Sequence, residues 1–255
     1  MCCFKNRKAD ISVIYKRING LNLPMQLFLP DGNIHRARTV LCIHGGGWKD
    51  AIKDNGEWDG GRMASNARFF AEHGFIAITA SYRSLELSET LNVSDLLEDC
   101  TDMVKYIRKH IHFIDFSNIV YMGDSAGGYF AVMMGLSQND LIRPYGVIAL
   151  NPVIDGFNDK WKYGFLGIDA DSMIPKNIIG EKCSDFLLMH GTADTVTDIE
   201  HTKEFNDMLL KKEHNSEFVG IPDAQHAFIL YDYKYPDEYV NLIMKDIIEY
   251  INNNW

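Results

Sequence analysis

Residues 119–128 read IVYMGDSAGG, and this stretch decides the fold. Its first four residues are apolar and predict a buried strand, while the small and apolar residues after Ser125 predict a helix. Between strand and helix lies the pattern G-x-S-x-G, which puts a serine on a tight turn at the end of a sheet. Side chains at Gly123 and Gly127 would clash across such a turn. The stretch therefore predicts Ser125 as a nucleophile with a raised, accessible hydroxyl.

Four further apolar runs, at 40–43, 75–80, 147–150 and 186–189, predict more strands of the same kind. Each is apolar on successive residues, as expected when helices cover both faces of a parallel sheet. Helical patterns fill the gaps, over residues 62–72, 96–111, 197–212 and 237–251. Strand and helix thus alternate, which predicts an α/β fold with a mostly parallel, doubly wound sheet flanked by helices.

Two early segments, residues 12–16 and 25–29, are expected to be antiparallel edge strands. Pro24 and Pro30 favour that position, because proline cannot donate a hydrogen bond to a neighbouring strand. Ser94 is the expected N-cap of the helix over residues 96–111.

The length and composition indicate a single globular domain over residues 1–255. The chain is 46% hydrophobic and 24% charged, which suits one sizeable core. Residues 156–182 form its longest connection and are expected to be a short lid insertion, with an aromatic wall from Phe157, Trp161, Tyr163 and Phe165. No large cap domain is expected.

Charge and cysteine content exclude several classes of partner. The formal net charge is −10, which repels phosphate backbones, so no nucleic-acid partner is expected. No targeting segment or membrane span is seen, so no membrane partner is expected. The five cysteines are scattered and odd in number, which favours a reducing, cytoplasmic location and no metal site. No organic cofactor is expected either, and a homodimer is possible.

The second motif is HGGGW at residues 44–48, directly after the predicted strand over residues 40–43. Acyl transfer passes through a tetrahedral oxyanion, which backbone N–H groups must meet. Successive glycines let the chain approach the substrate and turn its amides inward. We therefore predict an oxyanion hole formed by the amides of Gly46, Gly47 and Ala126.

A serine nucleophile needs a histidine base and a carboxylate that orients this base. In a fold of this type they follow the serine in the order acid, then histidine. Asp194, in HGTAD, and His226, in QHAF, fit that order and complete a predicted triad with Ser125. Asp155 and Asp198 are the alternative acids, and Asp194 is favoured over both.

The chain holds nine histidines, and most are expected to be structural or exposed. His44 is expected to shape the glycine loop by hydrogen bonding. His190, on the strand end before the predicted acid, is expected to be packed and hydrogen-bonded.

Together these motifs resemble a known family. HGGGW, SYR at 81–83, LLEDC at 96–100, GDSAGG, HGTAD and QHAF resemble, in this order, the hormone-sensitive-lipase-like carboxylesterases. They are also similar to the small α/β-hydrolase esterases that include acetyl-xylan and feruloyl esterases. The resemblance implies an α/β-hydrolase fold, the Ser125–Asp194–His226 triad and the oxyanion hole named above. The chain departs from the pattern of this family in two ways, and both concern the substrate pocket. The sequence before its first strand is too short for an N-terminal helical cap, and SLELS at 84–88 lacks the usual proline.

HGGxW also resembles kynurenine formamidases, which cleave an N-formyl amide with the same machinery. This resemblance makes Trp48 a candidate substrate-binding residue, although an indole at this point suits a core anchor under the loop better.

The expected function is that of a carboxylesterase, which cleaves short-chain esters of small molecules through an acyl-enzyme intermediate. An aryl formamidase, an acetyl-xylan or feruloyl esterase, and a small peptidase are the alternative enzymes. A catalytically silent receptor or interaction protein on the same fold is the alternative of another class.

Overall fold

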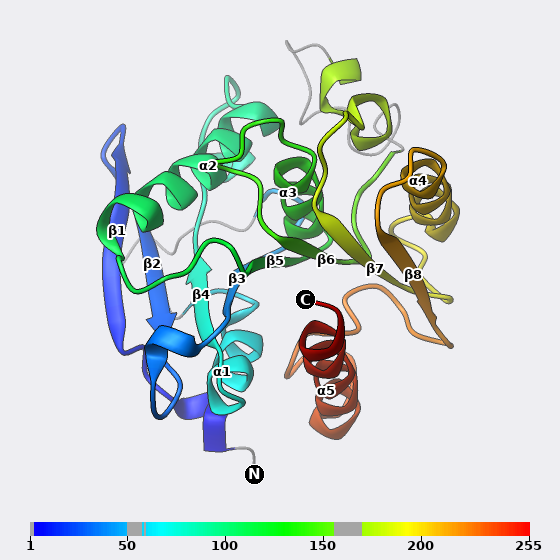
Figure 1. Ribbon diagram of the computed structural model, residues 1–255. Coiled ribbons are helices and arrows are strands. Elements are labelled where there is room, and N and C mark those ends of the chain that lie inside the picture. Colours follow the sequence, from blue (N-terminus) through cyan, green and yellow to red (C-terminus); the bar gives the residue numbers. More distant parts are fainter. Residues whose placement is uncertain (1–2, 50–57, 59, 156–169) are drawn as a thin grey trace.

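The computed structural model describes residues 3–49, 58, 60–155 and 170–255. In this part, eight strands form one sheet in the order β1-β2-β4-β3-β5-β6-β7-β8 (Figure 1). The strands are β1 (Ile11–Ile18), β2 (Leu21–Phe28), β3 (Thr39–Ile43), β4 (Ile76–Ala80), β5 (Ile119–Asp124), β6 (Gly146–Leu150), β7 (Asp185–Gly191) and β8 (Ser216–Ile221). The strands β3 to β8 are parallel to their neighbours among themselves, whereas β2 pairs antiparallel with both β1 and β4. The predicted mostly parallel, doubly wound sheet is confirmed.

Helices cover both faces of the sheet (Figure 1). On one face lie α2 (Val93–His110), α3 (Ala126–Gly135) and α4 (Ile199–Lys211), and on the other lie α1 (Ala64–Glu72) and α5 (Asp237–Asn254). Short 3-10 helices are η1 (Cys3–Asn6), η2 (Ile34–Arg36), η3 (Leu85–Leu87), η6 (Ala170–Met173) and η7 (Pro175–Ile178). None of the helices within the described ranges combines the length and the apolar character needed to cross a membrane.

The middle of the sheet is fully buried. Every residue of β3, β4, β5 and β6 is buried, because helices pack on both faces. All ten residues of α3 are buried as well, which explains why its sequence, AGGYFAVMMG, has no polar face. The turn between β5 and α3 is therefore held by packed structure on every side.

The predicted edge position is right for β1 and wrong for the segment around residues 25–29. β2 lies between β1 and β4, so it is an inner strand. Pro24 is tolerated there because the pairing with β1 is irregular at this point, with a shift of register between Ile14 and Lys16. The carbonyl of Pro24 still accepts a hydrogen bond from Ser81 N at 3.0 Å.

Helix α2 begins one turn earlier than its apolar stripe suggested. Its N-cap is Asn92, not Ser94, and the side chain of Asp95 accepts a hydrogen bond from the Asn92 amide in a capping box. Further along α2, the buried Asp99 carboxylate pairs with Arg83 Nε and with Lys16 Nζ, both at 2.7 Å. The SYR and LLEDC motifs thus meet in one buried ion cluster that ties α2 to the end of β4 and to β1.

The first half of the expected lid, residues 156–169, falls outside the described residues. The aromatic residues predicted to form its wall lie within residues 156–169, which the structure does not describe. The rest of the connection, residues 170–182, contains η6 and η7, and Tyr129 of α3 donates a hydrogen bond from its hydroxyl to the Met173 carbonyl at 2.9 Å.

Candidate active site

The turn after β5 has the strained backbone that its sequence predicted. Ser125 has φ 52° and ψ −117°, a conformation that residues with a side chain rarely adopt. A Cβ atom on Gly127 would lie 2.1 Å from the carbonyl oxygen of Ile43, and one on Gly123 would lie 2.3 Å from that of Gly127. The amide of Ser125 donates to the Leu150 carbonyl of β6 at 2.9 Å. The close approach of β3, β5 and β6 to this turn therefore requires glycine on both sides of the serine.

The structure brings Ser125, His226 and Asp194 together, although the first two are 101 positions apart in the chain. His226 Nε2 lies 2.9 Å from Ser125 Oγ, and His226 Nδ1 lies 2.7 Å from Asp194 Oδ2. Because a carboxylate only accepts, Nδ1 carries the proton, and Nε2 of the neutral ring is left to accept the proton of the serine. This arrangement can activate a hydroxyl for attack.

The Asp194 carboxylate is held ionised. Burial alone would raise its pKa, but hydrogen bonds from His190 and His226 and the attraction of the His226 ring in its protonated form outweigh burial, so the pKa lies well below its usual range. The backbone amides of Val196 and Thr197 add hydrogen bonds to Asp194 Oδ1, at 2.7 and 3.1 Å. A permanent negative charge thus faces the Nδ1 side of the histidine.

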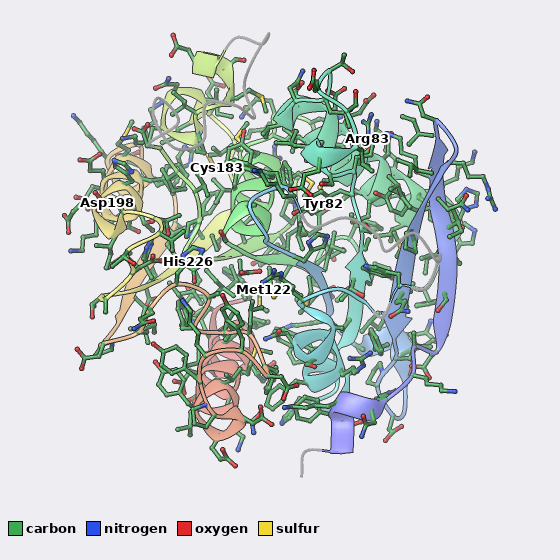
Figure 2. All side chains as sticks on the ribbon, turned by 180° about the vertical axis from the view of Figure 1, so that it is seen from behind. Tyr82, Arg83, Met122, Cys183, Asp198 and His226 are labelled. Atoms are coloured by element: carbon green, nitrogen blue, oxygen red, sulfur yellow. The ribbon has the colours of Figure 1, made fainter. Side chains whose placement is uncertain are left out.

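The two alternative acids have other partners. Asp155 forms an ion pair with Lys176 at 2.6 Å. Asp198 accepts a hydrogen bond from Glu200 N at 2.9 Å as the N-cap of α4, and Figure 2 shows it apart from His226. Of the three candidate acids, Asp194 is the one that contacts the imidazole of His226.

The loop with the acid and the loop with the histidine are bonded to each other. Ala193 N donates to the Ala224 carbonyl, and Asp223 N donates to Thr192 Oγ1, both at 2.9 Å. Asn151, just after β6, accepts a hydrogen bond from the amide of Ala227 on its side-chain oxygen at 3.2 Å. These contacts fix the distance between the two loops.

Sequence reasoning missed three residues that support this site. Asn151 is fully buried and has φ 39°, Thr197 contacts both loops, and the Tyr235 hydroxyl accepts a hydrogen bond from the Gln225 amide at 2.7 Å. A polar residue directly after a buried strand is a usable signal for Asn151. Thr197 also contacts Asp194 only three residues away, but its contact with His226 and that of Tyr235 with Gln225 follow no local sequence pattern.

The expected oxyanion loop lies beside the serine turn. β3 and β5 are paired neighbours with Ile43 opposite Gly123, so the loop after β3 and the turn after β5 start from the same edge of the sheet. Gly46 and Gly47 have φ values of 108° and 62°, which glycine adopts without strain. Ala126 opens α3, so its amide has no acceptor within the helix. The role of these three amides as oxyanion donors stays a prediction.

Trp48 and His44 both support the loop from within the protein. The Trp48 side chain is 0% exposed and packs edge-on against Tyr129, with ring centroids 5.6 Å apart. The Trp48 ring therefore has no exposed surface on which a substrate could bind. It packs in the core under the glycine loop, in the anchoring position that was the alternative to substrate binding. His44 stacks on Tyr82, as their ring centroids are 4.3 Å apart, and the Tyr82 hydroxyl donates to the His44 carbonyl at 2.7 Å.

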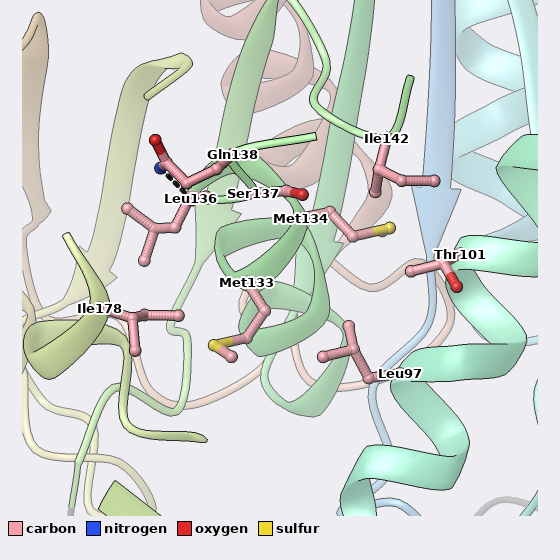
Figure 3. Close-up of a pocket in the computed structure, with 9 residues that line it drawn as sticks. All are labelled: Leu97, Thr101, Met133, Met134, Leu136, Ser137, Gln138, Ile142 and Ile178. Atoms are coloured by element: carbon pink, nitrogen blue, oxygen red, sulfur yellow. Dashed lines mark hydrogen bonds between the residues drawn. The ribbon is translucent and has the colours of Figure 1, made fainter. Parts of the chain in front are cut away.

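A separate cavity of about 300 Å³ lies between α2 and the C-terminal end of α3 (Figure 3). It is lined by Leu97 and Thr101 of α2, by Met133 and Met134 of α3, and by Ile178 of η7. Ser125 precedes the other end of α3, so this cavity is not adjacent to Ser125. In the part of the chain that the structure describes, no group of three or more His, Cys, Asp or Glu residues could hold a metal ion.

A mostly parallel sheet with a serine on the turn between strand and helix, followed by an acid and a histidine on later loops, defines the α/β-hydrolase fold. The chain belongs to the BD-FAE family, whose model matches residues 25–158. This range holds the glycine loop and the serine turn, and it ends before Asp194 and His226.

One relative and one esterase of known structure each share less than a quarter of their residues with this chain in the matched regions. The chain is 23% identical over 233 residues to inactive dipeptidyl peptidase 10 of Rattus norvegicus, a match that covers 86% of this chain and 29% of that protein. It thus spans less than a third of the length of this relative. Esterase 2 of Thermogutta terrifontis, phosphoramylated by tabun, has the same fold with a TM-score of 0.78 and 21% identity over 94% of each chain. The butyrate-bound form of that esterase gives a TM-score of 0.77 with the same identity and coverage.

Proposed function

We propose that the protein is a serine esterase that cleaves carboxylic esters of small molecules through an acyl-enzyme intermediate. The observation that carries this proposal is the continuous line of contacts from Ser125 Oγ through the His226 imidazole to Asp194, with distances of 2.9 and 2.7 Å. A nucleophile, a base and an orienting acid in this geometry are the parts that acyl transfer needs.

In the first step, Ser125 Oγ bonds to the carbonyl carbon of the ester while His226 Nε2 takes the hydroxyl proton. The carbonyl oxygen becomes an oxyanion, to which we assign the amides of Gly46, Gly47 and Ala126 as donors. The bond to the alcohol oxygen then breaks, and His226 returns the proton to that oxygen. Water repeats the sequence on the acyl-enzyme, which releases the acid and restores Ser125.

Two similarities support this proposal. Esterase 2 of Thermogutta terrifontis is phosphoramylated by tabun in one structure and has butyrate bound in another. Modification by an organophosphorus compound is typical of an activated serine, and butyrate is the acid product of a short-chain ester. We extend both properties to this chain as part of the proposal.

A catalytically silent protein on the same fold is the second candidate, because one relative is the inactive dipeptidyl peptidase 10. The intact line from serine to acid speaks against this candidate. One experiment separates the two: the purified protein is treated with a fluorophosphonate probe, and the modified residue is mapped by mass spectrometry. Modification of Ser125 supports the esterase, and an unmodified Ser125 under conditions that label a known serine esterase supports the silent protein.

A further inference from the structure

One carboxylate oxygen of Asp194 contacts two other side chains in addition to His226. Asp194 Oδ2 lies 2.7 Å from His226 Nδ1, 3.0 Å from Thr197 Oγ1 and 3.3 Å from His190 Nε2. The other oxygen, Oδ1, is engaged by two backbone amides. A carboxylate has about four lone-pair sites, so the whole acceptor capacity of Asp194 is in use.

His190 faces Asp194 with a hydrogen-bond donor. Its side chain is fully buried at the end of β7, and Nε2 lies 3.3 Å from two acceptors, Asp194 Oδ2 and the Thr197 carbonyl. Its Nδ1 lies 2.9 Å from Thr202 Oγ1, a hydroxyl that can donate. A neutral ring satisfies all these partners when Nε2 carries the proton. His190 then donates toward Asp194 Oδ2, the same oxygen that accepts the hydrogen bond from His226 Nδ1.

Thr197 links the acid to its surroundings through three of its own atoms. Its amide donates to Asp194 Oδ1, its carbonyl faces His190 Nε2, and its hydroxyl lies 3.0 Å from Asp194 Oδ2. The hydroxyl is also 3.3 Å from His226 Nδ1, whose proton goes to the nearer Asp194 Oδ2 at 2.7 Å. The next acceptor for the hydroxyl proton, the Asn151 carbonyl, is 3.3 Å away. The shorter distance to Asp194 and the charge of its carboxylate both favour donation to Oδ2.

We propose that His190 and Thr197 are positioning residues of the triad, whose donors to Asp194 Oδ2 fix the carboxylate and limit how strongly it attracts protonated His226. This inference rests on the proposed function, because it assigns His226 as the base. Among the described residues, the titratable groups that contact Asp194 are His190 and His226. His226 also has a charged neighbour in Lys234, whose Nζ donates to the His226 carbonyl at 3.1 Å.

Loss of a donor to Asp194 Oδ2 should let the carboxylate attract protonated His226 more strongly. Each donor spreads the negative charge of Oδ2 over one more hydrogen bond, so less of it acts on His226. Without the Thr197 hydroxyl, the carboxylate stabilises the protonated imidazole more strongly, and His226 stays protonated up to a higher pH. The base is then neutral only at higher pH, so the rate of serine attack rises later along the pH axis.

Thr197→Val removes the hydroxyl and keeps the shape, whereas Thr197→Ser keeps the hydroxyl. Thr39→Val is the matched control, since Thr39 is also buried but its hydroxyl has no hydrogen-bond partner among the described residues and lies at the start of β3, away from the site. Two measurements are made on each protein: the NMR titration of the His226 ring, and the rate of Ser125 phosphorylation by paraoxon between about pH 5 and 9.

For Thr197→Val, we expect the midpoint of both curves to move up by about one pH unit and the rate at pH ~6 to fall about tenfold. Thr197→Ser and Thr39→Val should leave both midpoints within about 0.2 pH unit of the wild type.

A second pair of variants, His190→Leu and His190→Gln, repeats the comparison at the other donor. Glutamine can place an amide N–H near the position of Nε2, whereas leucine cannot donate. This pair also covers the case in which Thr197→Val does not fold.

Unchanged midpoints in the folded Thr197→Val and His190→Leu proteins would overturn the inference, even with a lower rate, because a packing role alone would lower the rate without shifting the titration. Failure of the proposed function has a different signature: the wild type would not react with paraoxon at Ser125. The NMR titration still tests the inference in that case, because it needs no turnover.

Discussion

Gly191 and Ala224 approach each other so closely that a Cβ atom on Gly191 would lie 2.2 Å from the Ala224 carbonyl oxygen. Gly191 ends β7 three residues before Asp194, and Ala224 lies two residues before His226. The same carbonyl accepts the hydrogen bond from Ala193 N. The separation of the acid from the base is therefore set by a backbone contact between their loops.

This contact predicts that Gly191→Ala is strongly destabilising. The added methyl group has to push a backbone carbonyl aside, and we expect a loss of about 3 kcal/mol or more in the free energy of unfolding. Gly220→Ala is the matched control on the neighbouring strand, because its nearest contact would be the Thr192 methyl group at 3.6 Å. Urea unfolding of both variants checks this, and equal stabilities would show that the loops can separate at little cost.

Removal of the proposed nucleophile or base should abolish most of the activity. We expect Ser125→Ala and His226→Ala each to lower kcat for a p-nitrophenyl ester by about 10⁴-fold or more, because the pair acts as one unit. Asp194→Asn should lower it by about 10³ to 10⁴-fold, since serine and histidine remain. Near-normal turnover by the purified Ser125→Ala protein contradicts the assignment, and Asp155→Asn, whose carboxylate pairs with Lys176, is the control acid.

The pH dependence should report the base and not the acid. Because the pKa of Asp194 lies well below its usual range, its carboxylate stays ionised throughout an assay between about pH 5 and 9. The base must be neutral to accept the serine proton, and a histidine has a reference pKa of about 6.5. We expect kcat/KM to rise between about pH 5.5 and 7.5 and then to level off. A maximum below about pH 5 would instead indicate carboxylate chemistry.

The buried ion cluster at Asp99 should matter for stability more than for catalysis. Asp99→Asn leaves Arg83 and Lys16 without their buried partner, so we expect a loss of about 3 kcal/mol in the free energy of unfolding. Asp102→Asn is the control, because this carboxylate also pairs with Lys16 but is 29% exposed, and we expect a loss of about 1 kcal/mol or less. Thermal unfolding of the two variants measures the difference, and similar melting temperatures would rule out a special role for Asp99.

The acyl chain of the substrate should be short. A longer chain gains about 0.8 kcal/mol for each buried methylene only where an apolar surface receives it. The expected lid at 156–182 is small and partly polar, so its sequence suggests such a surface for only a few carbons. We expect kcat/KM to be highest for acetyl to butyryl esters and to fall by about eight carbons. A series of two-, four-, eight- and twelve-carbon p-nitrophenyl esters tests this, with N-formylkynurenine as the substrate whose faster cleavage would favour a formamidase.

Local sequence patterns predicted most of the fold because the central strands are buried on both faces. Runs such as VLCI at 40–43 and IVYM at 119–122 are apolar throughout, which is typical of buried parallel strands. The edge position predicted for β2 was wrong, because the irregular pairing that accommodates Pro24 belongs to the contact with β1. The cap predicted at Ser94 was wrong because α2 already begins at Val93. Asn92 caps it in a capping box with Asp95.

The sequence by itself determined the strand–turn–helix around Ser125, because the apolar run, the G-x-S-x-G pattern and the apolar helix follow one another directly in the chain. The tertiary structure adds a second reason for Gly127, since a Cβ atom there would meet the Ile43 carbonyl of β3. The sequence also determined the order along the chain of the three residues proposed as nucleophile, acid and base. Only the tertiary structure decided which acid meets His226, since that depends on how the loops after β7 and β8 pack against each other. It alone placed His226 on the carboxylate oxygen that His190 and Thr197 also contact, because a hydrogen bond between the loops after β7 and β8 depends on a distance in space that no spacing along the chain records.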